Sequence, residues 1–469
     1  MSGIAAVHGA INAVRLVQLM SYAQQDRGTA SAGIAWFDSR GKILQFKGTG
    51  LVNQIFGRRP DFDELEVSTA IGQTRWPTHG AVEYGDAQPI VRLNKYGPFA
   101  VASNGNISNA DELREKLLGQ GACFSTETSD THIIPTSLAQ QGASTFLEAF
   151  VETLRGLRGG YALVCLTPIG LILACDPIGY RPLVLGRCRD KGKVATVAAS
   201  ETAALDLIGA EFIRNVEPGE IIVVNDEGIK SHYELGEVNI KRCSVELSSL
   251  QQPSSVAFGI AVSRFRDQLG RKLAEEHPIG KNDPDDKLKT VVVPIPDSGN
   301  EMALGYAAAL NLPIGSGLVR HSHGANRHLP TGSERTQEEL SVLRKISVVA
   351  NVVRDKRVIL IHSRILRGRT SRVLIKLITE AGAKEVHLLI SVPPTVSTCW
   401  SGVGRPSDSV LISTQNSVED LRIKLGKPKS LHFLSLGGFE EVLDKLGNDC
   451  NTFCTSCFTG EYSPGTLPE

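Results

Sequence analysis

From about residue 288 onward, apolar strand-like segments alternate regularly with amphipathic helix-like segments. The strand-like segments are KTVVVPIP (289–296), RVILIH (357–362) and EVHLLISVPP (385–394). Between them lie NEMALGYAAALNL (300–312) and SRVLIKLITEAGA (371–383). Such alternation is typical of right-handed βαβ units, which assemble into a parallel sheet. We therefore predict an α/β fold with a parallel sheet for this part of the chain.

Two polar loops, PDSGNE (296–301) and HSRILRGRTS (362–371), follow strands of this predicted sheet. Ligands of such sheets bind beyond the carboxyl ends of the strands. The second loop offers backbone N–H groups, hydroxyls and guanidinium groups at a helix N-terminus, which suits a phosphate. The preceding strand, however, ends in His362-Ser363, without a carboxylate for a sugar hydroxyl or a metal ion.

The first half of the chain has a different pattern. Residues 2–235 combine many short β-rich runs with a few amphipathic helices, such as 109–118 and 143–156, which indicates layers of α and β structure. The polar segment 236–256, which contains a proline and several serines, is the predicted junction. A chain of 469 residues is expected to form two or three domains.

Charge and hydropathy exclude some classes of binding partner for this protein. Lys and Arg number 50, as do Asp and Glu, so a large polyanion such as DNA is not favoured. The longest apolar stretch, 161–175, is broken by Thr167, Pro168 and Gly170 and is shorter than a membrane span of about 20 residues. The first 20 residues lack a basic leader. We expect a cytoplasmic protein with no nucleic-acid or membrane partner.

The cysteines are unevenly distributed. Cys450, Cys454 and Cys457 lie within eight residues of one another near the C-terminus. In a cytosolic chain such a cluster favours metal or redox chemistry over a disulfide framework. Cys243 and Cys399 are candidates to complete a site of four thiolates, which suits an iron–sulfur cluster and also suits zinc.

Several signatures appear in order along the chain and resemble the amidophosphoribosyltransferase family, also called glutamine phosphoribosylpyrophosphate amidotransferases. They are DRGTASAGI (26–34), GQTRWPTHG (72–80), SNGNISNADEL (103–113), SDTH (129–132), DPIGYRPLVLG (176–186), ASETAALDLIGAEFIRNVEPGEI (199–221), PIPDSG (294–299), RGRTSR (367–372) and FCTSCFTGEY (453–462). Together they cover nearly the entire chain.

The resemblance implies an α+β N-terminal-nucleophile (Ntn) glutaminase sandwich at 2–235, the junction at 236–256, and an α/β type I phosphoribosyltransferase domain with a C-terminal cysteine cluster at 257–469. In the family, the glutaminase releases ammonia from glutamine, and the second domain adds it to C1 of phosphoribosyl pyrophosphate and displaces pyrophosphate. The product, phosphoribosylamine, begins purine synthesis. Glutamine, a sugar phosphate or nucleotide, and a homo-oligomer are therefore expected.

The nucleophile differs from that of the family. The family's mature chain begins Cys-Gly-Ile, whereas this chain begins Met1-Ser2-Gly3-Ile4. Removal of Met1 would give Ser2 a free α-amine of pKa about 7.7–8.0, which can act as the base for its own hydroxyl. A serine depends wholly on that base, whereas a thiol is intrinsically nucleophilic. We therefore expect Ser2 to act as a weakened nucleophile.

The resemblance implies that the glutamine pocket is better preserved. Arg75 and Asp130 would hold the α-carboxylate and α-amine of glutamine, and Asn104 with Gly105 would form the oxyanion hole. Each feature also has an ordinary structural interpretation. An Arg and an Asp can form a surface ion pair that contributes little to stability, and Asn-Gly is a common hairpin turn.

At the transferase site the family carries Asp-Asp-Ser-Ile-Val-Arg-Gly-Thr-Thr-Ser, where this chain has HSRILRGRTS (362–371). The two acids, which in the family hold the ribose 2′ and 3′ hydroxyls, are absent. The loop retains residues for a 5′-phosphate, and PDSG retains residues for the pyrophosphate side or forms a plain turn. The implied phosphate-binding residues are Arg367, Gly368, Thr370 and Ser371, together with Asp297, Ser298 and Gly299. Mg²⁺ binding is expected to be weakened by the added positive charge.

The family's mobile loop corresponds here to 319–337, which lacks aromatic closing residues and is basic. It is either a solvated loop or a rebuilt anion site. Some family members hold a [4Fe-4S] cluster on four cysteines, and the matching residues here are Cys243, Cys399, Cys454 and Cys457. A [4Fe-4S] cluster is therefore expected, with zinc as the alternative.

Three hypotheses for the function remain open. The chain is a working amidophosphoribosyltransferase that uses Ser2; a pseudoenzyme that binds a nucleotide or associates with an active paralogue; or a glutaminase that feeds ammonia to a different phosphorylated acceptor. Because both active sites lack their defining chemical group, we expect reduced, lost or changed activity.

Overall fold

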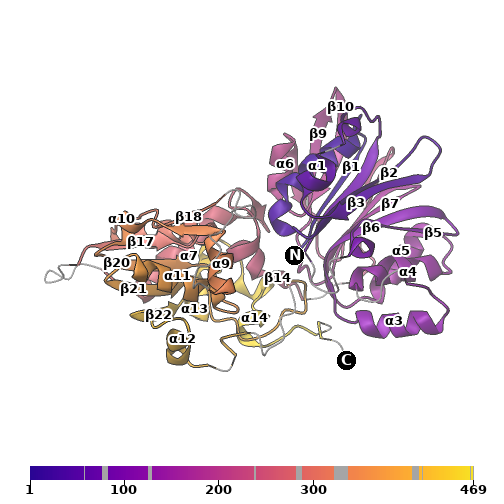
Figure 1. Cartoon of the computed structure of the whole chain (residues 1–469). Helices are drawn as coiled ribbons and strands as arrows, with labels where there is room; N and C mark the ends of the chain where they lie inside the picture. Colours follow the sequence, from indigo (N-terminus) through magenta and orange to yellow (C-terminus); the bar gives the residue numbers. More distant parts are fainter. Residues whose placement is uncertain are drawn as a thin grey trace.

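The structure is a computed structural model of the whole chain, and it describes residues 1–57, 59–76, 83–124, 129–236, 239–280, 288–321, 336–403, 411–414, 416–464 and 466–467. Figure 1 shows two parts side by side, one built from the indigo to magenta residues and one from the orange to yellow residues. In the described residues, no helix is both long enough and apolar enough to span a bilayer.

The first half contains two antiparallel sheets. The seven-stranded sheet has the order β11-β9-β10-β1-β4-β2-β3, and the six-stranded sheet has the order β13-β12-β8-β7-β6-β5. The strands of the first sheet are β1 Gly3–His8, β2 Ser31–Phe37, β3 Ile43–Thr49, β4 Thr69–Arg75, β9 Val184–Asp190, β10 Lys193–Ala199 and β11 Glu211–Asn215. Those of the second are β5 Ile90–Asn94, β6 Gly97–Ile107, β7 Gly159–Thr167, β8 Gly170–Cys175, β12 Ile221–Asn225 and β13 Gly228–His232.

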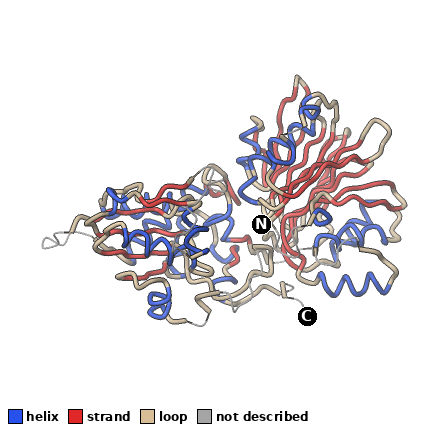
Figure 2. Tube along the Cα trace, in the orientation of Figure 1, coloured by secondary structure: helices blue, strands red, loops and turns tan. Residues whose placement is uncertain are grey.

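Helices cover the outer faces of both sheets, as Figure 2 shows. The helices over the first sheet are α1 Ala13–Ala23, α2 Val52–Phe56 and α6 Thr202–Leu207. Those over the second are α3 Ala110–Gly119, α4 Ile133–Gln140 and α5 Phe146–Arg155. Between the sheets, the inward side chains of β1, such as Ile4, share a core with those of β7, such as Val164. These four layers confirm the predicted α+β sandwich.

The apolar stretch that composition excluded as a membrane span is an internal hairpin. Strand β7 pairs antiparallel with β8, from Ala162↔Cys175 to Thr167↔Gly170. Every residue of β7 is buried because one of its faces contacts the other sheet and the opposite face contacts helices. This two-sided burial explains why the sequence of β7 is apolar throughout rather than alternating.

The second half is built on a four-stranded parallel sheet of order β17-β20-β21-β22. The strands are β17 Thr290–Pro294, β20 Arg357–His362, β21 Glu385–Ile390 and β22 Ser430–Phe433. The helices that share its core are α7 Val262–Glu276, α8 Asn300–Leu310, α11 Arg369–Glu380, α12 Val418–Lys424 and α13 Leu436–Lys445. The predicted α/β fold with a parallel sheet is therefore confirmed.

Shorter elements complete the chain. The small strands are β14 Arg242–Cys243, β15 Val256–Ala257, β16 Ile260–Ala261, β18 Leu318–Arg320, β19 Ile346–Val348 and β23 Phe453–Cys454. The short helices are α9 Gln337–Leu343, α10 Ala350–Val353 and α14 Ser456–Thr459. The single turns are η1 Gln25–Arg27, η2 Pro60–Asp63, η3 Tyr84–Asp86, η4 Asp130–His132, the π-helical η5 Glu246–Leu250 and η8 Cys450–Thr452.

The polar segment predicted as the junction is not an exposed linker. Within 236–256, β14 pairs in parallel with β23 near the C-terminus, and η5 buries Glu246 completely. The Glu246 carboxylate accepts hydrogen bonds from Arg27 and Arg181 of the first half at 3.0–3.1 Å. One acidic residue of the segment therefore belongs to a buried ion-pair network and not to an exposed linker.

Candidate functional site

One cavity of about 950 Å³ lies between the N-terminus and the loops of the parallel sheet. The first half contributes Met1, Arg27 and Trp76 to its wall. The second half contributes both polar loops, including Asp297, Ser298, His362, Arg364 and residues 367–371. The structure therefore brings Met1, just before β1, and the predicted phosphate loop to the walls of one open cavity.

Ser2 is buried at the start of β1 and is held by three contacts. Its backbone N–H donates to Asn104 Oδ1 at 3.2 Å, and its carbonyl oxygen accepts from Arg27 Nε at 2.9 Å. Its hydroxyl oxygen lies 3.4 Å from the Trp76 backbone N–H, which donates to it. Met1 precedes Ser2 and is also buried, and desolvation beside Arg27 lowers the pKa of the Met1 amine to about 4.

The two residues predicted for the oxyanion hole lie on β6, next to Ser2. Asn104 is fully buried, and its Nδ2 has no hydrogen-bond partner among the described residues. Gly105 has a φ of +148°, and an added Cβ would overlap the carbonyl oxygen of Gly160 on β7. Only glycine fits this position, and the arrangement leaves an amide donor available beside the serine.

Arg75 and Asp130 are both buried in the same region. Arg75 ends β4 and lies 3.6 Å from the carboxylate of Asp86, and Asp130 in η4 accepts a hydrogen bond from the Ile107 backbone at 2.9 Å. Desolvation lowers the pKa of Arg75, and the charges of Asp86 and Asp130 oppose that shift. Asp86 is a charged neighbour that the sequence did not predict, because the residues around it resemble those of any ordinary turn.

The residues that replace the acid pair are engaged within the protein. His362 Nδ1 lies 3.1 Å from Ser371 Oγ, and Ser363 Oγ donates to Ser298 Oγ at 2.7 Å. Burial lowers the pKa of His362 to about 4, so its ring is neutral at pH 7. The predicted phosphate loop leads into α11, where Gly368 at the N-cap has a φ of +72°. No carboxylate occupies either position at the end of β20.

The rest of this end of the cavity is basic. Arg364 Nε donates to Thr395 Oγ1 at 3.0 Å, and Arg320 forms an ion pair with Asp297 at 3.0 Å. Most of the predicted basic loop, residues 322–335, lies outside the described residues. At its start, His321 Nε2 lies 2.7 Å from Ser347 Oγ.

Four cysteines gather around one small pocket at the boundary of the two halves. They are Cys243, Cys399, Cys454 and Cys457. Cys243 lies directly opposite Cys454 in the parallel pair of β14 and β23, and Cys399 Sγ accepts from the Val403 backbone N–H at 3.3 Å. Burial raises the pKa of the Cys454 thiol to about 11, so a bound metal would have to displace protons.

The sulfur spacing tests which group could fit. No three of these four sulfur atoms, all of them in the described part of the chain, lie within 4.8 Å of one another. A tetrahedral zinc site with bonds of about 2.3 Å would place its sulfurs roughly 3.8 Å apart. The buried Arg181 lines the same pocket, and its Nε and Nη2 have no hydrogen-bond partner among the described residues. The four sulfur atoms are therefore farther apart than a tetrahedral zinc site requires, and buried guanidinium donors line the same pocket.

The cysteine pocket is linked to the predicted oxyanion strand. Asn106 Nδ2 on β6 donates to the carbonyl oxygen of Trp400, the residue after Cys399. A Cβ on Gly402 would lie 2.8 Å from the Gly105 backbone, so the two segments are in close contact. Cys450, the fifth cysteine near these positions, instead lies with Asp444 and Asp449, away from the pocket.

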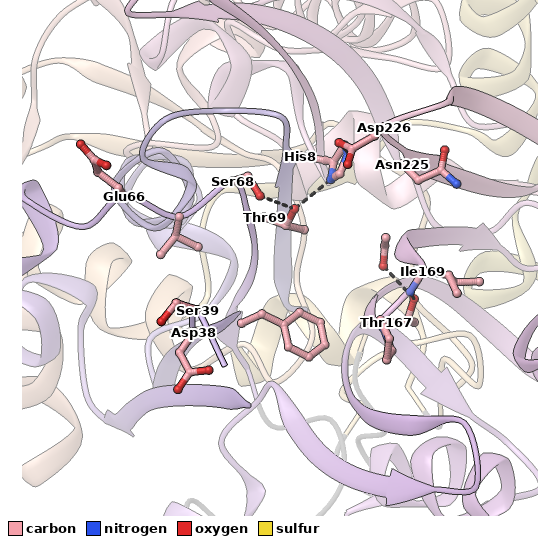
Figure 3. Close-up of a pocket in the computed structure, with 14 residues that line it drawn as sticks. His8, Asp38, Ser39, Glu66, Ser68, Thr69, Thr167, Ile169, Asn225 and Asp226 are labelled. Carbon is pink, nitrogen blue, oxygen red and sulfur yellow. Dashed lines mark hydrogen bonds and ion pairs between the residues drawn. The ribbon is translucent and has the colours of Figure 1, made fainter. Parts of the chain in front are cut away.

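Figure 3 shows a separate cavity of about 450 Å³ at the far end of the sandwich. His8, at the opposite end of β1 from Ser2, points into it and lies 2.8 Å from Thr69 Oγ1. Three carboxylates, of Asp38, Glu66 and Asp226, also line it. None of the residues predicted from the sequence lies in this cavity.

Comparisons with known proteins cover nearly the whole chain. A family model described as a glutamine amidotransferase domain matches residues 79–206. The chain is 38% identical over 460 residues to amidophosphoribosyltransferase 1, chloroplastic, of Arabidopsis thaliana, covering 98% of this chain and 78% of that protein. It is 35% identical to the amidophosphoribosyltransferase of Bacillus subtilis, covering 98% and 93%.

The fold agrees with these relatives. The solved structure of glutamine phosphoribosylpyrophosphate amidotransferase from B. subtilis, complexed with ADP and GMP, superposes with a TM-score of 0.86 at 34% identity, over 98% of this chain and 97% of that one. Sequence and fold agree over nearly the full length, and the chain belongs to the amidophosphoribosyltransferase family.

Proposed function

We propose that this protein binds glutamine and a phosphorylated ligand but forms phosphoribosylamine far more slowly than its family's reaction requires. The proposal rests on the end of β20. There His362 and Ser363 stand where the family has two acids, and they form hydrogen bonds with Ser371 and Ser298. Neither side chain offers a charged acceptor to a ribose hydroxyl. The site therefore retains a phosphate loop without the usual means of holding the sugar.

The size of the defect follows from the hydrogen bonds that are missing. A hydrogen bond to a charged group contributes roughly 1.5–3 kcal/mol. Loss of two such bonds weakens ribose recognition by about 3–6 kcal/mol, which is about a hundredfold to ten-thousandfold. A loss of ribose binding of this size would distinguish a pseudoenzyme or an altered enzyme from a member of the family with standard activity.

The glutaminase half supports retention of glutamine binding. Asn104 presents an amide donor beside Ser2 that has no partner among the described residues, and the buried Arg75 lies near the carboxylates of Asp86 and Asp130. In the proposal, Arg75 and Asp130 hold the amino-acid group, Asn104 and Gly105 form the oxyanion hole, and Ser2 attacks the side-chain amide after removal of Met1. Hydrolysis is slow because the serine lacks the intrinsic nucleophilicity of a thiol.

A glutaminase that serves a different phosphorylated acceptor is the second candidate function. The cavity favours it, because Met1, the residue before Ser2, and the predicted phosphate loop line the same space, so ammonia released at Ser2 would form next to that space. A third candidate function is association with an active paralogue in place of catalysis. We also propose that the protein forms a homo-oligomer.

We further propose that Cys243, Cys399, Cys454 and Cys457 hold a [4Fe-4S] cluster. The sulfur spacing, which is wider than zinc requires, and the buried donors of Arg181 support this assignment. A cluster on Cys399 would fix the segment that contacts Asn106 and would thereby stabilise the oxyanion strand. Mg²⁺ has a smaller role, because the acids at β20 are absent.

The decisive experiment measures the transferase reaction of the whole protein with and without the need for the glutaminase reaction. Purified, iron-reconstituted protein is assayed for pyrophosphate release from phosphoribosyl pyrophosphate, first with glutamine and then with ammonia, which bypasses Ser2. We expect very slow release with either donor, and recovery of the ammonia-dependent reaction by about a hundredfold or more in the His362→Asp/Ser363→Asp double variant. Rapid release by the unmodified protein would disprove the proposal.

A parallel assay follows ammonia release from glutamine alone. Slow glutaminase activity that disappears in Ser2→Ala, with no pyrophosphate release, identifies the altered enzyme. Absence of both activities, with iron and sulfide retained, identifies the pseudoenzyme. N-terminal sequencing of the purified protein shows whether Met1 has been removed.

A further inference from the structure

The transferase end of the cavity contains an excess of positive charge. Four arginines of the second half, Arg320, Arg364, Arg367 and Arg369, line it with a single carboxylate of that half, that of Asp297; the other carboxylate on the cavity wall, that of Asp26, comes from the first half, next to Arg27 in the sequence. Arg320 and Asp297 neutralise each other in an ion pair of 3.0 Å. In the part of the chain that the structure describes, the other three guanidinium groups have no carboxylate partner. This end of the cavity therefore carries about three uncompensated positive charges.

Other arginines on the cavity wall do not add to this excess. Arg27 is bound to Glu201 and Glu246 at 3.0 Å, and Arg266 lies 3.8 Å from Glu301. Both arginine side chains are almost completely buried. Their charges are balanced inside the protein, so the excess is confined to the loop from 364 to 369.

The three uncompensated groups occupy two separate places. Arg367 and Arg369 flank Gly368 at the first turn of the 12-residue helix α11, whose backbone N–H groups suit one phosphoryl group. Arg364 also lines the cysteine pocket, which Arg367 and Arg369 do not, and its hydrogen bond to Thr395 anchors its guanidinium group there. Two anionic groups of one ligand could therefore be bound at the same time.

The same region is poorly suited to a divalent cation. Mg²⁺ requires oxygen ligands, usually one or two carboxylates together with substrate phosphates. Asp297 is already paired with Arg320, and the hydroxyls of Ser363 and Ser298 are bonded to each other. The positive charge that would balance a bound diphosphate here therefore comes from arginine side chains.

We propose that this cavity binds a ligand with two phosphoryl groups, such as a diphosphate ester, without a divalent metal, and that Arg364 binds the second phosphoryl group. The inference rests on the proposed function, because it names the ligand class of the altered transferase site. It assigns to Arg364 the counter-charge that an acid-bound Mg²⁺ would otherwise supply. Guanidinium groups bind phosphate through paired hydrogen bonds, which makes arginine suited to this role.

The test is calorimetric titration of the full-length protein with inorganic pyrophosphate, in excess EDTA and again in excess MgCl₂ at the same ionic strength. We expect binding in EDTA that added Mg²⁺ does not strengthen. Arg364→Gln should weaken binding in EDTA about tenfold to a hundredfold, because it removes one charge-assisted contact. Arg344→Gln, an exposed arginine of the same half that does not line the cavity, is the matched control and should bind as the unmodified protein does.

A second variant restores the family's sequence at this loop, with His362→Asp, Ser363→Asp and Arg364→Ser together. Its binding of pyrophosphate should become dependent on Mg²⁺. Because Arg364 also lines the cysteine pocket, iron content and visible absorbance are measured for every variant.

Binding of pyrophosphate that requires Mg²⁺ in the unmodified protein would overturn the inference, as would equal affinity of the Arg364→Gln and Arg344→Gln variants. Either result leaves the proposed function in place if phosphoribosylamine formation is slow. Rapid phosphoribosylamine formation would instead refute the proposed function, whatever the calorimetry shows.

Discussion

Replacement of Glu246 by Gln should destabilise the protein more than its single lost charge suggests. The carboxylate is fully buried and accepts three hydrogen bonds, two from Arg27 at 3.0 Å and one from Arg181 at 3.1 Å. Glutamine keeps the shape of the side chain but removes the charge and directs an N–H₂ group toward the guanidinium groups. Arg27 retains Glu201, whereas Arg181 loses its ion-pair partner.

Removing one partner of a buried ion pair costs about 3–5 kcal/mol, because the remaining charge stays desolvated. We expect a loss in this range in the free energy of unfolding of the first half. The matched control is Glu441→Gln, which breaks an exposed ion pair of 2.6 Å with Lys272. Exposed pairs contribute less than about 1 kcal/mol, so this variant should resemble the unmodified protein.

The assay is urea denaturation followed by tryptophan fluorescence, since Trp36 lies in the sandwich core and Trp400 lies beside the cysteine pocket. Equal unfolding midpoints for Glu246→Gln and Glu441→Gln would refute the argument. That result would mean that the buried network relaxes or admits water when one charge is lost.

Three further predictions concern other buried groups. Burial lowers the pKa of His132 from 6.5 to about 4, so the unfolded state binds more protons at acidic pH and stability falls below pH 6.5. His132→Gln should remove up to about 2 kcal/mol of the loss between pH 6.5 and 5, measured by denaturation at each pH. Gly105→Ala should lower thermal stability and abolish glutaminase activity, because its Cβ overlaps Gly160; normal activity would contradict this. Arg181→Gln should make the midpoint potential of a reconstituted cluster more negative in a spectroelectrochemical titration, and an unchanged potential would rule out its role.

Much of the transferase half could be predicted because its signals are local. Strand β20, the loop after it and helix α11 are consecutive in sequence, so periodicity and loop composition place a phosphate-binding loop at one sheet edge. The cysteine spacing near the C-terminus likewise indicated the pocket, with Cys243 and Cys399 as candidates to complete it, although only the resemblance selected Cys454 and Cys457 over Cys450. The basic character of the loop at 364–369 is also visible in the sequence.

The candidate glutamine site could not be predicted from local patterns in the same way. Ser2 and Asn104 are 102 residues apart, and they meet because β4 lies beside β1 in one sheet while β6 faces them from the other. The role of Asp86 beside Arg75 was not evident, because its turn resembles any other. The internal pairing of His362 and Ser363 with neighbouring serines is likewise decided by tertiary structure and not by local sequence.

The sequence by itself determined which chemical groups this protein has and which it lacks: a serine in place of a cysteine, no acid pair after β20, and four cysteines in the right order. These are properties of residue identity and of patterns a few residues long. Tertiary structure decided that Met1, next to the serine, and the predicted phosphate loop line one cavity, and that Arg364 has no carboxylate partner among the residues that the structure describes. Such facts depend on packing between segments hundreds of residues apart, and no local propensity encodes the charge balance that results.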